Sequence, residues 1–186
     1  MSLKLFRSTG FHSILTPGEA RLALHPGWAV AAVAGWIAVA CNVWLWQALL
    51  GHGALLPALT GTVAAFAYLA ALLSALNWRR TFKTASSLAL LTAALLAAGA
   101  WTQEAPLQRL LEGRRVMSML PTWASLFGWE VPMLLAMLGG LPVLWLWNTQ
   151  LRRLSRAEQW KLNVAALSCY LPLAVALQWL LPRLPA

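Results

Sequence analysis

Long uninterrupted apolar runs, separated by short polar or basic segments, dominate the pattern of this chain. A helix needs about 20 apolar residues to cross the hydrocarbon core of a membrane, and the runs approach or exceed that length. They lack the alternation expected of strands in a membrane-spanning barrel. The pattern predicts an all-α protein with five membrane-spanning helices, at about 27–50, 54–77, 84–101, 129–147 and 162–181.

The segments that flank these runs divide the chain further. Residues 1–25 mix apolar and basic positions without the apolar core of a signal peptide, which predicts a tail on the cytoplasmic membrane surface. Residues 26–182 form the membrane domain, and residues 102–127 form an outside loop with a short amphipathic helix. Ser155 and Glu158 match a capping box, so we expect the last helix to begin before Leu162.

The composition agrees with a membrane protein and excludes several other classes. Hydrophobic residues make up 60% of the chain and charged residues 10%, whereas a soluble domain has roughly 25% charged residues. A soluble enzyme and a disordered tail are therefore excluded. The net charge is +9, but the basic residues are spread over several connections. Because they form no single stripe, no nucleic-acid partner is expected.

The distribution of Lys and Arg predicts the orientation of the helices. Ten of the 14 lie in the N-terminal tail and in the second and fourth connections, and four lie in the remaining segments. Cytoplasmic segments of membrane proteins carry the excess of basic residues. The sequence therefore predicts a five-helix transmembrane bundle with a cytoplasmic N-terminus and a periplasmic C-terminus.

Side chains that bind metals or haem are few and scattered. His25 and His52 lie at opposite ends of the first span, about 40 Å apart at the rise of a helix, so they cannot share one haem. Cys41 and Cys169 lie in separate spans with no His or Glu at their depth, whereas a metal site needs three or four clustered ligands. The span centres also lack the charged residues that mark ion pathways. No cofactor and no metal are expected.

Polar and small residues within the spans predict contacts between helices. Asn42, Asn77 and Asn163 are expected to form hydrogen bonds between spans. Gly139 and Gly140, followed by Pro142, predict close packing and a kink in the fourth span.

Two groups of residues are candidates for binding lipid or protein. Arg114 and Arg115 are adjacent in the outside loop and suit a lipid phosphate, with simple anchoring at the interface as the alternative. Small residues at helical spacing and large aromatic residues in the first span suit contact with another helix. These candidate interface residues are Ala31, Gly35, Trp36 and Trp44. The alternative is that they face the chain's own bundle or lipid.

Three motifs are similar in order and composition to those of a known family. They are Ala40-Cys41-Asn42-Val43-Trp44, Leu126-Phe127-Gly128-Trp129 and Leu138-Gly139-Gly140-Leu141-Pro142. The first lies in the first span, the second at the start of the fourth span after an outside loop, and the third near the centre of the fourth span. The chain thereby resembles the N-terminal membrane domain of the lipid A phosphoethanolamine transferases, from about Leu22 to Leu181.

The resemblance implies a bacterial inner-membrane protein, but two parts of the family pattern are missing. The family carries a periplasmic catalytic domain with a Thr nucleophile and a zinc site of Asp, Glu and His. Here the sequence ends at Ala186 and contains no Asp. Arg114 stands where the family has Asn, and the family's Thr-Asp pair is absent. No substrate-binding residue is therefore carried over, and we expect no catalytic activity.

Two functions remain open on this basis. The first is a non-catalytic membrane protein, acting as an accessory or interaction subunit of a larger membrane complex or as a lipid-binding module. The second is the lipid-substrate-binding membrane half of a split or truncated phosphoethanolamine transferase. A small transporter is a weaker third possibility, because the spans lack buried charges. The expected partners are membrane phospholipid and a larger membrane-protein complex.

Overall fold

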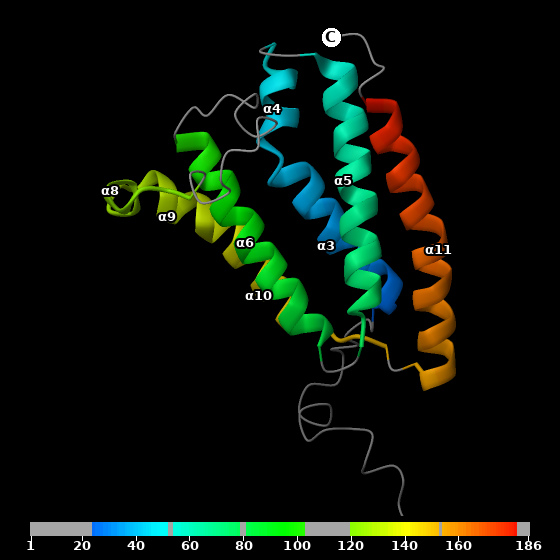
Figure 1. The fold of residues 1–186 in the computed structure, drawn as a ribbon. Coiled ribbons are helices and arrows are strands. Elements are labelled where there is room, and N and C mark those ends of the chain that lie inside the picture. Colours follow the sequence, from blue (N-terminus) through cyan, green and yellow to red (C-terminus); the bar gives the residue numbers. More distant parts are fainter. Residues whose placement is uncertain (1–23, 52–53, 79–80, 103–119, 153, 182–186) are drawn as a thin grey trace, which may run out of the picture.

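The computed structural model describes residues 24–51, 54–78, 81–102, 120–152 and 154–181. Within these ranges the regular secondary structure is helical, apart from a single bridge that pairs Leu24 with Leu151 (Figure 1). The helices are α3 (Pro26–Ala40), α4 (Val43–Leu49), α5 (Leu55–Ala75), α6 (Phe82–Thr102), α8 (Trp123–Leu126), α9 (Glu130–Leu135), η2 (Ala136–Gly140), α10 (Leu141–Asn148) and α11 (Arg156–Leu180).

The helices of the described residues are long and apolar enough for a multi-pass membrane protein. α5, α6, α11 and the continuous run from α9 to α10 each meet the length and hydropathy of a membrane span. The α3–α4 pair adds a fifth span if its two parts are counted together. The all-helical architecture predicted from the sequence is thus confirmed, and the orientation in a membrane stays a prediction.

The first span differs from the continuous helix predicted over 27–50, because it is broken after Ala40. The axes of α3 and α4 differ by 53°. Asn42 stabilises the break: its Oδ1 accepts from the N–H of Leu45 and caps α4, as Asn favours. Its Nδ2 donates to Oγ1 of Thr62 on α5, over 2.9 Å. The predicted hydrogen bond between spans is confirmed for Asn42.

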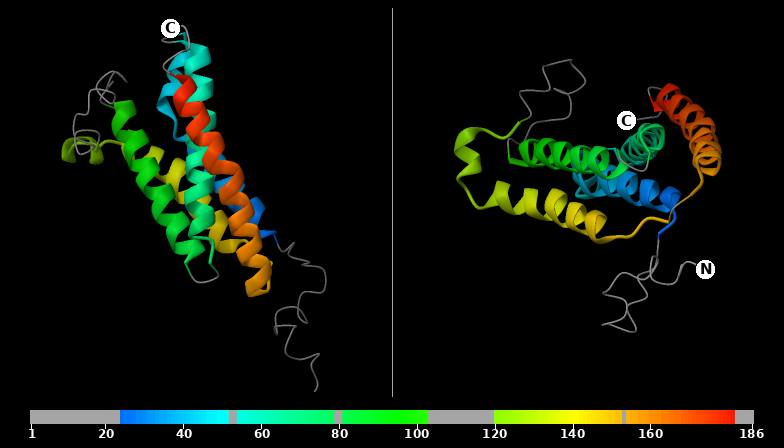
Figure 2. Two further views of the ribbon diagram at one scale, coloured as in Figure 1. Left: turned by 45° about the vertical axis from the view of Figure 1, so that its right-hand side comes forward. Right: turned by 90° about the horizontal axis from the view of Figure 1, so that it is seen from below.

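The helices pack in two groups that α3 connects. α5 lies between α3 and α11, while α6 packs against α9, η2 and α10, and α3 also contacts α6. Figure 2 shows α11 at the outer edge of this arrangement, beside α5. The largest buried side chains of the central core come from four helices: Val30, Leu73, Phe82, Leu90 and Leu146.

Small side chains on α5 allow its neighbours to approach closely. The buried residues of this helix include Ala58, Ala67, Ala70, Ala71 and Ser74. Between membrane helices, small residues allow close backbone contact. Aromatic and polar contacts complete the α5–α11 pair: Phe66 and Tyr170 meet edge to face at 5.8 Å between ring centroids, and Oη of Tyr68 donates to Oε1 of Gln178.

Where the sequence predicts a kink, the fourth span contains a π-helical turn, η2. The N–H of Leu141 bonds to the carbonyl of Ala136, five residues back. A Cβ atom on Gly139 would lie 3.1 Å from Cβ of Ala94 on α6, so glycine allows this close contact. The close packing predicted at this glycine is therefore confirmed. Pro142 follows the turn, where its missing N–H and its ring disfavour a regular helix.

The capping box predicted before Leu162 is present, and α11 begins at Arg156. Oγ of Ser155 accepts from the N–H of Glu158 at 3.2 Å, and Oε2 of Glu158 accepts from the N–H of Ser155 at 3.0 Å. These hydrogen bonds lower the pKa of Glu158, which lies before the predicted span, and the charges of Arg152 and Lys161 lower it further.

Replacing the cap should weaken the start of α11. We expect Ser155→Ala to lower the melting temperature by about 3 °C at neutral pH, because an N-cap is lost. The pKa of Glu158 is lowered by folding, so its stabilisation is present above the ordinary carboxyl pKa and disappears as the pH falls through the lowered value. The difference in melting temperature between Ser155→Ala and the wild type should therefore shrink as the pH falls through this value. Thermal unfolding in detergent at several pH values measures this.

Ser168→Ala is the matched control for the cap. Oγ of Ser168 donates to a carbonyl within α11 and caps no helix end. We expect its melting temperature to match that of the wild type. Equal losses in both variants would contradict the role given to Ser155.

Candidate functional site

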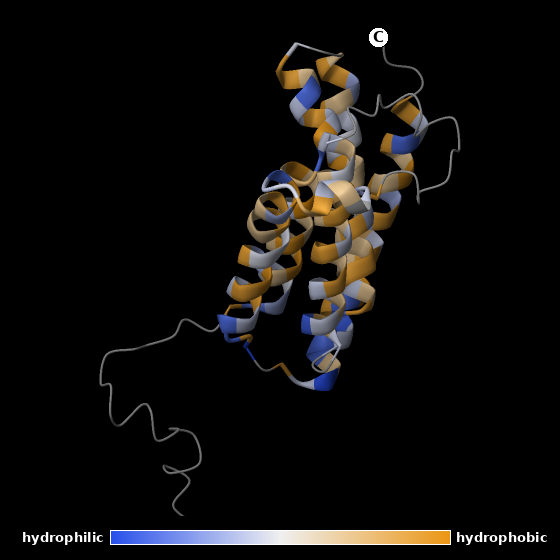
Figure 3. Cartoon of the chain, turned by 90° about the vertical axis from the view of Figure 1, so that its left-hand side faces the viewer, coloured by the Kyte–Doolittle hydropathy of each residue, from blue (hydrophilic) through white to orange (hydrophobic). Residues whose placement is uncertain are grey.

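One end of the bundle brings together segments that are far apart in the sequence. α3, α6 and α11 begin there, and α5 and α10 end there (Figure 1). Two backbone hydrogen bonds join Leu24 to the α10–α11 connection. The N–H of Leu24 donates to the carbonyl of Gln150 at 2.8 Å, and the N–H of Arg152 donates to the carbonyl of Leu24 at 2.9 Å. Figure 3 shows hydrophilic positions at this end and largely hydrophobic helices beyond it.

A cavity of about 750 Å³ opens among these segments. Its cationic side chains are Lys83 from the start of α6, Arg152 from the connection and Arg156 from the first residue of α11. Pro26, Phe82, Leu151 and Leu154 contribute apolar surface, and Trp78 lies on the turn after α5. The cavity therefore combines positive charge with apolar walls.

Lys83 is held in place by the C-terminus of α10. Its Nζ donates to the carbonyls of Trp147 at 3.1 Å and Thr149 at 3.0 Å, and lies 5.8 Å from the centroid of the Trp147 ring. Free carbonyls and the negative end of the helix dipole favour a cation at this position. Nε1 of Trp147 donates in turn to Oγ of Ser87 at 2.9 Å, which fixes the indole against α6.

Amide side chains connect α11 to the end of α5. Nε2 of Gln159 donates to the carbonyl of Asn77 at 2.7 Å and to Oδ1 of Asn163 at 3.2 Å. Nδ2 of Asn163 donates to the same carbonyl at 3.4 Å. The hydrogen bonding predicted between helices for Asn163 is confirmed. Asn77 takes part through its backbone carbonyl.

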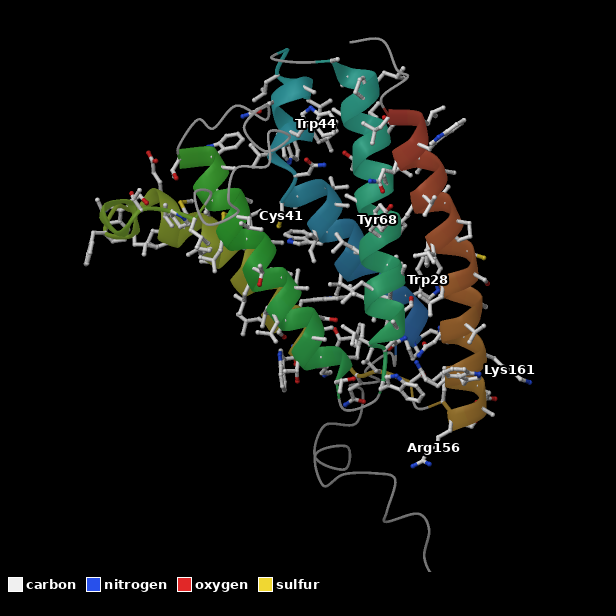
Figure 4. All side chains as sticks on the ribbon, in the orientation of Figure 1. Trp28, Cys41, Trp44, Tyr68, Arg156 and Lys161 are labelled. Carbon is white, nitrogen blue, oxygen red and sulfur yellow. The ribbon has the colours of Figure 1, made fainter. Side chains whose placement is uncertain are left out.

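The two arginines of the cavity carry no ion pair or hydrogen bond from their guanidinium groups within the part of the chain that the structure describes. The acidic group nearest to this region along α11 is Glu158, which accepts from Ser155 and acts on Arg152 through its charge alone. The side chain of Arg156 points out of the bundle at the edge of the cavity that it lines, whereas Lys161 points outward beyond the cavity (Figure 4). The charges of Arg152 and Arg156 are available to a ligand from outside the chain.

A second hollow, of about 310 Å³, lies between α3 and α10 and is lined by apolar surface. Ala32, Val33 and Trp36 face Leu141, Pro142 and Trp145 across it. Nε1 of Trp36 donates to the carbonyl of Leu138 at 3.0 Å. A regular helix would supply the N–H of residue 142 to that carbonyl, but residue 142 is proline. Trp36 thus supplies a donor to a carbonyl that has no amide at the regular i+4 position.

The structure places most of the candidate interface residues against the chain's own helices. Trp44 packs on Gly61 of α5, where a Cβ would lie 2.3 Å from Cζ3 of the indole (Figure 4). A Cβ on Gly35 would lie 3.8 Å from Cε2 of Phe66. The indole of Trp36 donates to the carbonyl of Leu138 in the fourth span, and Ala31 is half-buried. These positions agree with the alternative of packing within the bundle.

The other candidate residues lie apart from the cavity or outside the residues that the structure describes. Arg114, Arg115 and most of the loop 102–127 lie outside the described residues. His25 caps α3, with its Nδ1 accepting from the N–H of Gly27 at 3.3 Å. Cys41 is half-buried, whereas Cys169 is exposed on α11. Among the residues that the structure describes, no three His, Cys, Asp or Glu side chains cluster as metal ligands.

The outward face of α11 is a feature that the sequence reasoning missed. Asn163 and Ala174 are buried toward α5, and the opposite face of the helix carries exposed small residues. They are Ala165, Ser168, Cys169, Pro172 and Ala176. The spacing of Ala165, Ser168, Pro172 and Ala176, at three or four residues, was visible in the sequence, but which face of α11 packs on α5 was not.

Comparisons with known proteins add no family to this description. No family model, curated protein or solved structure shows significant similarity to the chain. The resemblance to the phosphoethanolamine transferase membrane domain stays a prediction that rests on the motifs quoted above.

Proposed function

We propose that this protein is a non-catalytic interaction subunit of a larger assembly in the bacterial inner membrane. The outward face of α11 carries this proposal. Within the described residues α11 packs chiefly against α5, and its far side presents Ala165, Cys169 and Ala176 at intervals of four and seven residues. That side is where a partner helix would bind.

The size of these side chains favours a helix over lipid as their neighbour. Lipid chains fill space around any side chain, so a lipid-facing surface gains nothing from small residues. Two helices, in contrast, gain packing contacts when small residues let their backbones approach. α5 uses small residues in this way inside the bundle, where Ala67 and Ala70 are fully buried. We therefore infer a transmembrane helix of another protein as the occupant.

Adding bulk to this face should weaken the assembly. We expect Ala176→Leu to reduce recovery of the partner by about tenfold, because overpacking a close helix contact costs of order 1–3 kcal/mol. Cross-linking in native membranes through Cys169, followed by purification in mild detergent and mass spectrometry, identifies the partner and measures its recovery.

Val175→Leu is the matched control, since Val175 is the exposed neighbour of Ala176 and lies about 100° around the helix. Its partner recovery should equal that of the wild type. Recovery of a lone monomer, or of a homodimer only, would count against the interaction subunit. So would an equal loss in both variants.

A further inference from the structure

We propose that the basic cavity at the start of α11 binds the phosphate group of an anionic phospholipid. The proposal rests on the proposed function only in placing the bundle in a membrane. The ligand groups would be the guanidinium donors of Arg152 and Arg156, with Lys83 adding positive charge behind them. Guanidinium groups match phosphate oxygens in geometry and in charge.

Helix ends reinforce the positive potential of this cavity. α3, α6 and α11 all begin beside it, and Pro26, Phe82 and Arg156 from their first turns line it. The N-terminus of a helix carries partial positive charge and favours anions. Three helix N-termini and three cations therefore act on the same space.

The opposing partial charges at this end are already occupied by the chain's own donors. α5 and α10 end here, and their last carbonyls would repel an anion. Lys83 donates to two carbonyls at the end of α10, and Gln159 and Asn163 donate to the carbonyl of Asn77 after α5. The carboxylate of Glu158 accepts from Ser155 and does not line the cavity. The charge that the cavity presents to a ligand is therefore net positive.

The walls of the cavity distinguish a lipid from free phosphate. Leu151 and Leu154 are partly exposed and offer apolar surface next to the cations, which suits a glycerol backbone and the first carbons of acyl chains. Trp78 lines the cavity and lies 6.4 Å from Trp160 between ring centroids. Paired indoles are typical of the level of lipid headgroups. Inorganic phosphate would use only the cationic part.

The test compares lipid retention by the full-length protein in mild detergent. Native mass spectrometry measures binding of added phosphatidylglycerol, with zwitterionic phosphatidylcholine as the lipid control. We expect Arg152→Gln and Arg156→Gln each to weaken phosphatidylglycerol binding by about fivefold, the contribution of one basic residue near an anionic lipid. Arg156→Lys, which keeps the charge but not the guanidinium geometry, should weaken the binding less than Arg156→Gln.

Lys161→Gln is the matched charge control, because Lys161 lies on the same helix end and outside the cavity. Its phosphatidylglycerol binding should be unchanged. Equal losses for Lys161→Gln and Arg156→Gln would overturn the site in favour of general surface charge, as would unchanged binding in both arginine variants. Displacement of the lipid by millimolar inorganic phosphate would overturn the lipid as the source and identify a soluble phosphate.

The two proposals can fail separately. The arginine variants leave the outward face of α11 intact, so partner recovery tests the interaction subunit while phosphatidylglycerol retention tests the cavity. A failure to recover a partner would count against the interaction subunit alone. A failure of the arginine variants to lower phosphatidylglycerol retention would count against the cavity alone.

Discussion

Gly61→Ala should lower the free energy of unfolding by about 2 kcal/mol, although alanine favours a helix over glycine. The added Cβ would lie 2.3 Å from Cζ3 of Trp44, and 3.1 and 3.2 Å from two further atoms of the same ring. An indole held between α4 and α5 cannot turn aside as a flexible side chain would. Overpacking costs about 1–3 kcal/mol, which exceeds the gain in helix propensity of about 0.5–1 kcal/mol.

Gly35→Ala provides the control for this prediction. Its Cβ would meet Cε2 of Phe66 at 3.8 Å, an ordinary contact, so the propensity gain should dominate and stability should stay equal or rise. Denaturant unfolding in mixed micelles measures both variants. Trp44→Leu combined with Gly61→Ala should recover part of the loss. A stable Gly61→Ala protein would show that α4 does not pack on α5 as described.

Trp36→Phe should cost about 2 kcal/mol, because it removes the indole N–H that donates to the carbonyl of Leu138, whose regular i+4 partner is a proline. In a membrane no water replaces that donor. The cost should depend on Pro142: in a Pro142→Ala background, the amide of residue 142 supplies the missing donor. There we expect Trp36→Phe to cost less than about 1 kcal/mol, from packing alone.

The double-mutant cycle separates the hydrogen bond from the packing of the ring. Trp145→Phe is the control, since Trp145 lines the same apolar hollow. It should show the packing loss without any dependence on Pro142. Equal costs of Trp36→Phe with and without the proline would contradict the role of Trp36 as a donor to the fourth span.

The lengths of the apolar runs predicted the positions of the helices, but not the break in the first span. Residues 27–50 contain no charge and no internal proline, so nothing in the hydropathy pattern interrupts them. The break depends on Asn42, whose side chain competes with the backbone for the amide of Leu45. Thr62, 20 residues away, accepts its other hydrogen bond. A tertiary partner of that kind is not readable from local sequence.

The capping box and the glycine pair were predictable as local motifs, although Ala94 on α6, which Gly139 approaches, lies 45 positions away. Ser155 needs only Glu158, and Gly139 to Pro142 form one local motif. The basic cavity was not predictable as a site, although its cations were recognised in orienting the chain. Lys83 and Arg156 are 73 positions apart, and only the packing of α6, α10 and α11 joins them. The outward face of α11 was not predictable either, because it is defined by the packing of α11 on α5.

The bend between α3 and α4 has a consequence for how the first span fits a bilayer. A straight helix over Pro26–Leu49 would reach about 36 Å along its axis. With α4 turned by 53°, the reach along the axis of α3 falls to about 30 Å, the thickness of a typical hydrocarbon core. By holding this angle, the hydrogen bond between Asn42 and Thr62 shortens the reach of a long apolar segment toward that thickness. Thinner or thicker membranes would act first on this angle.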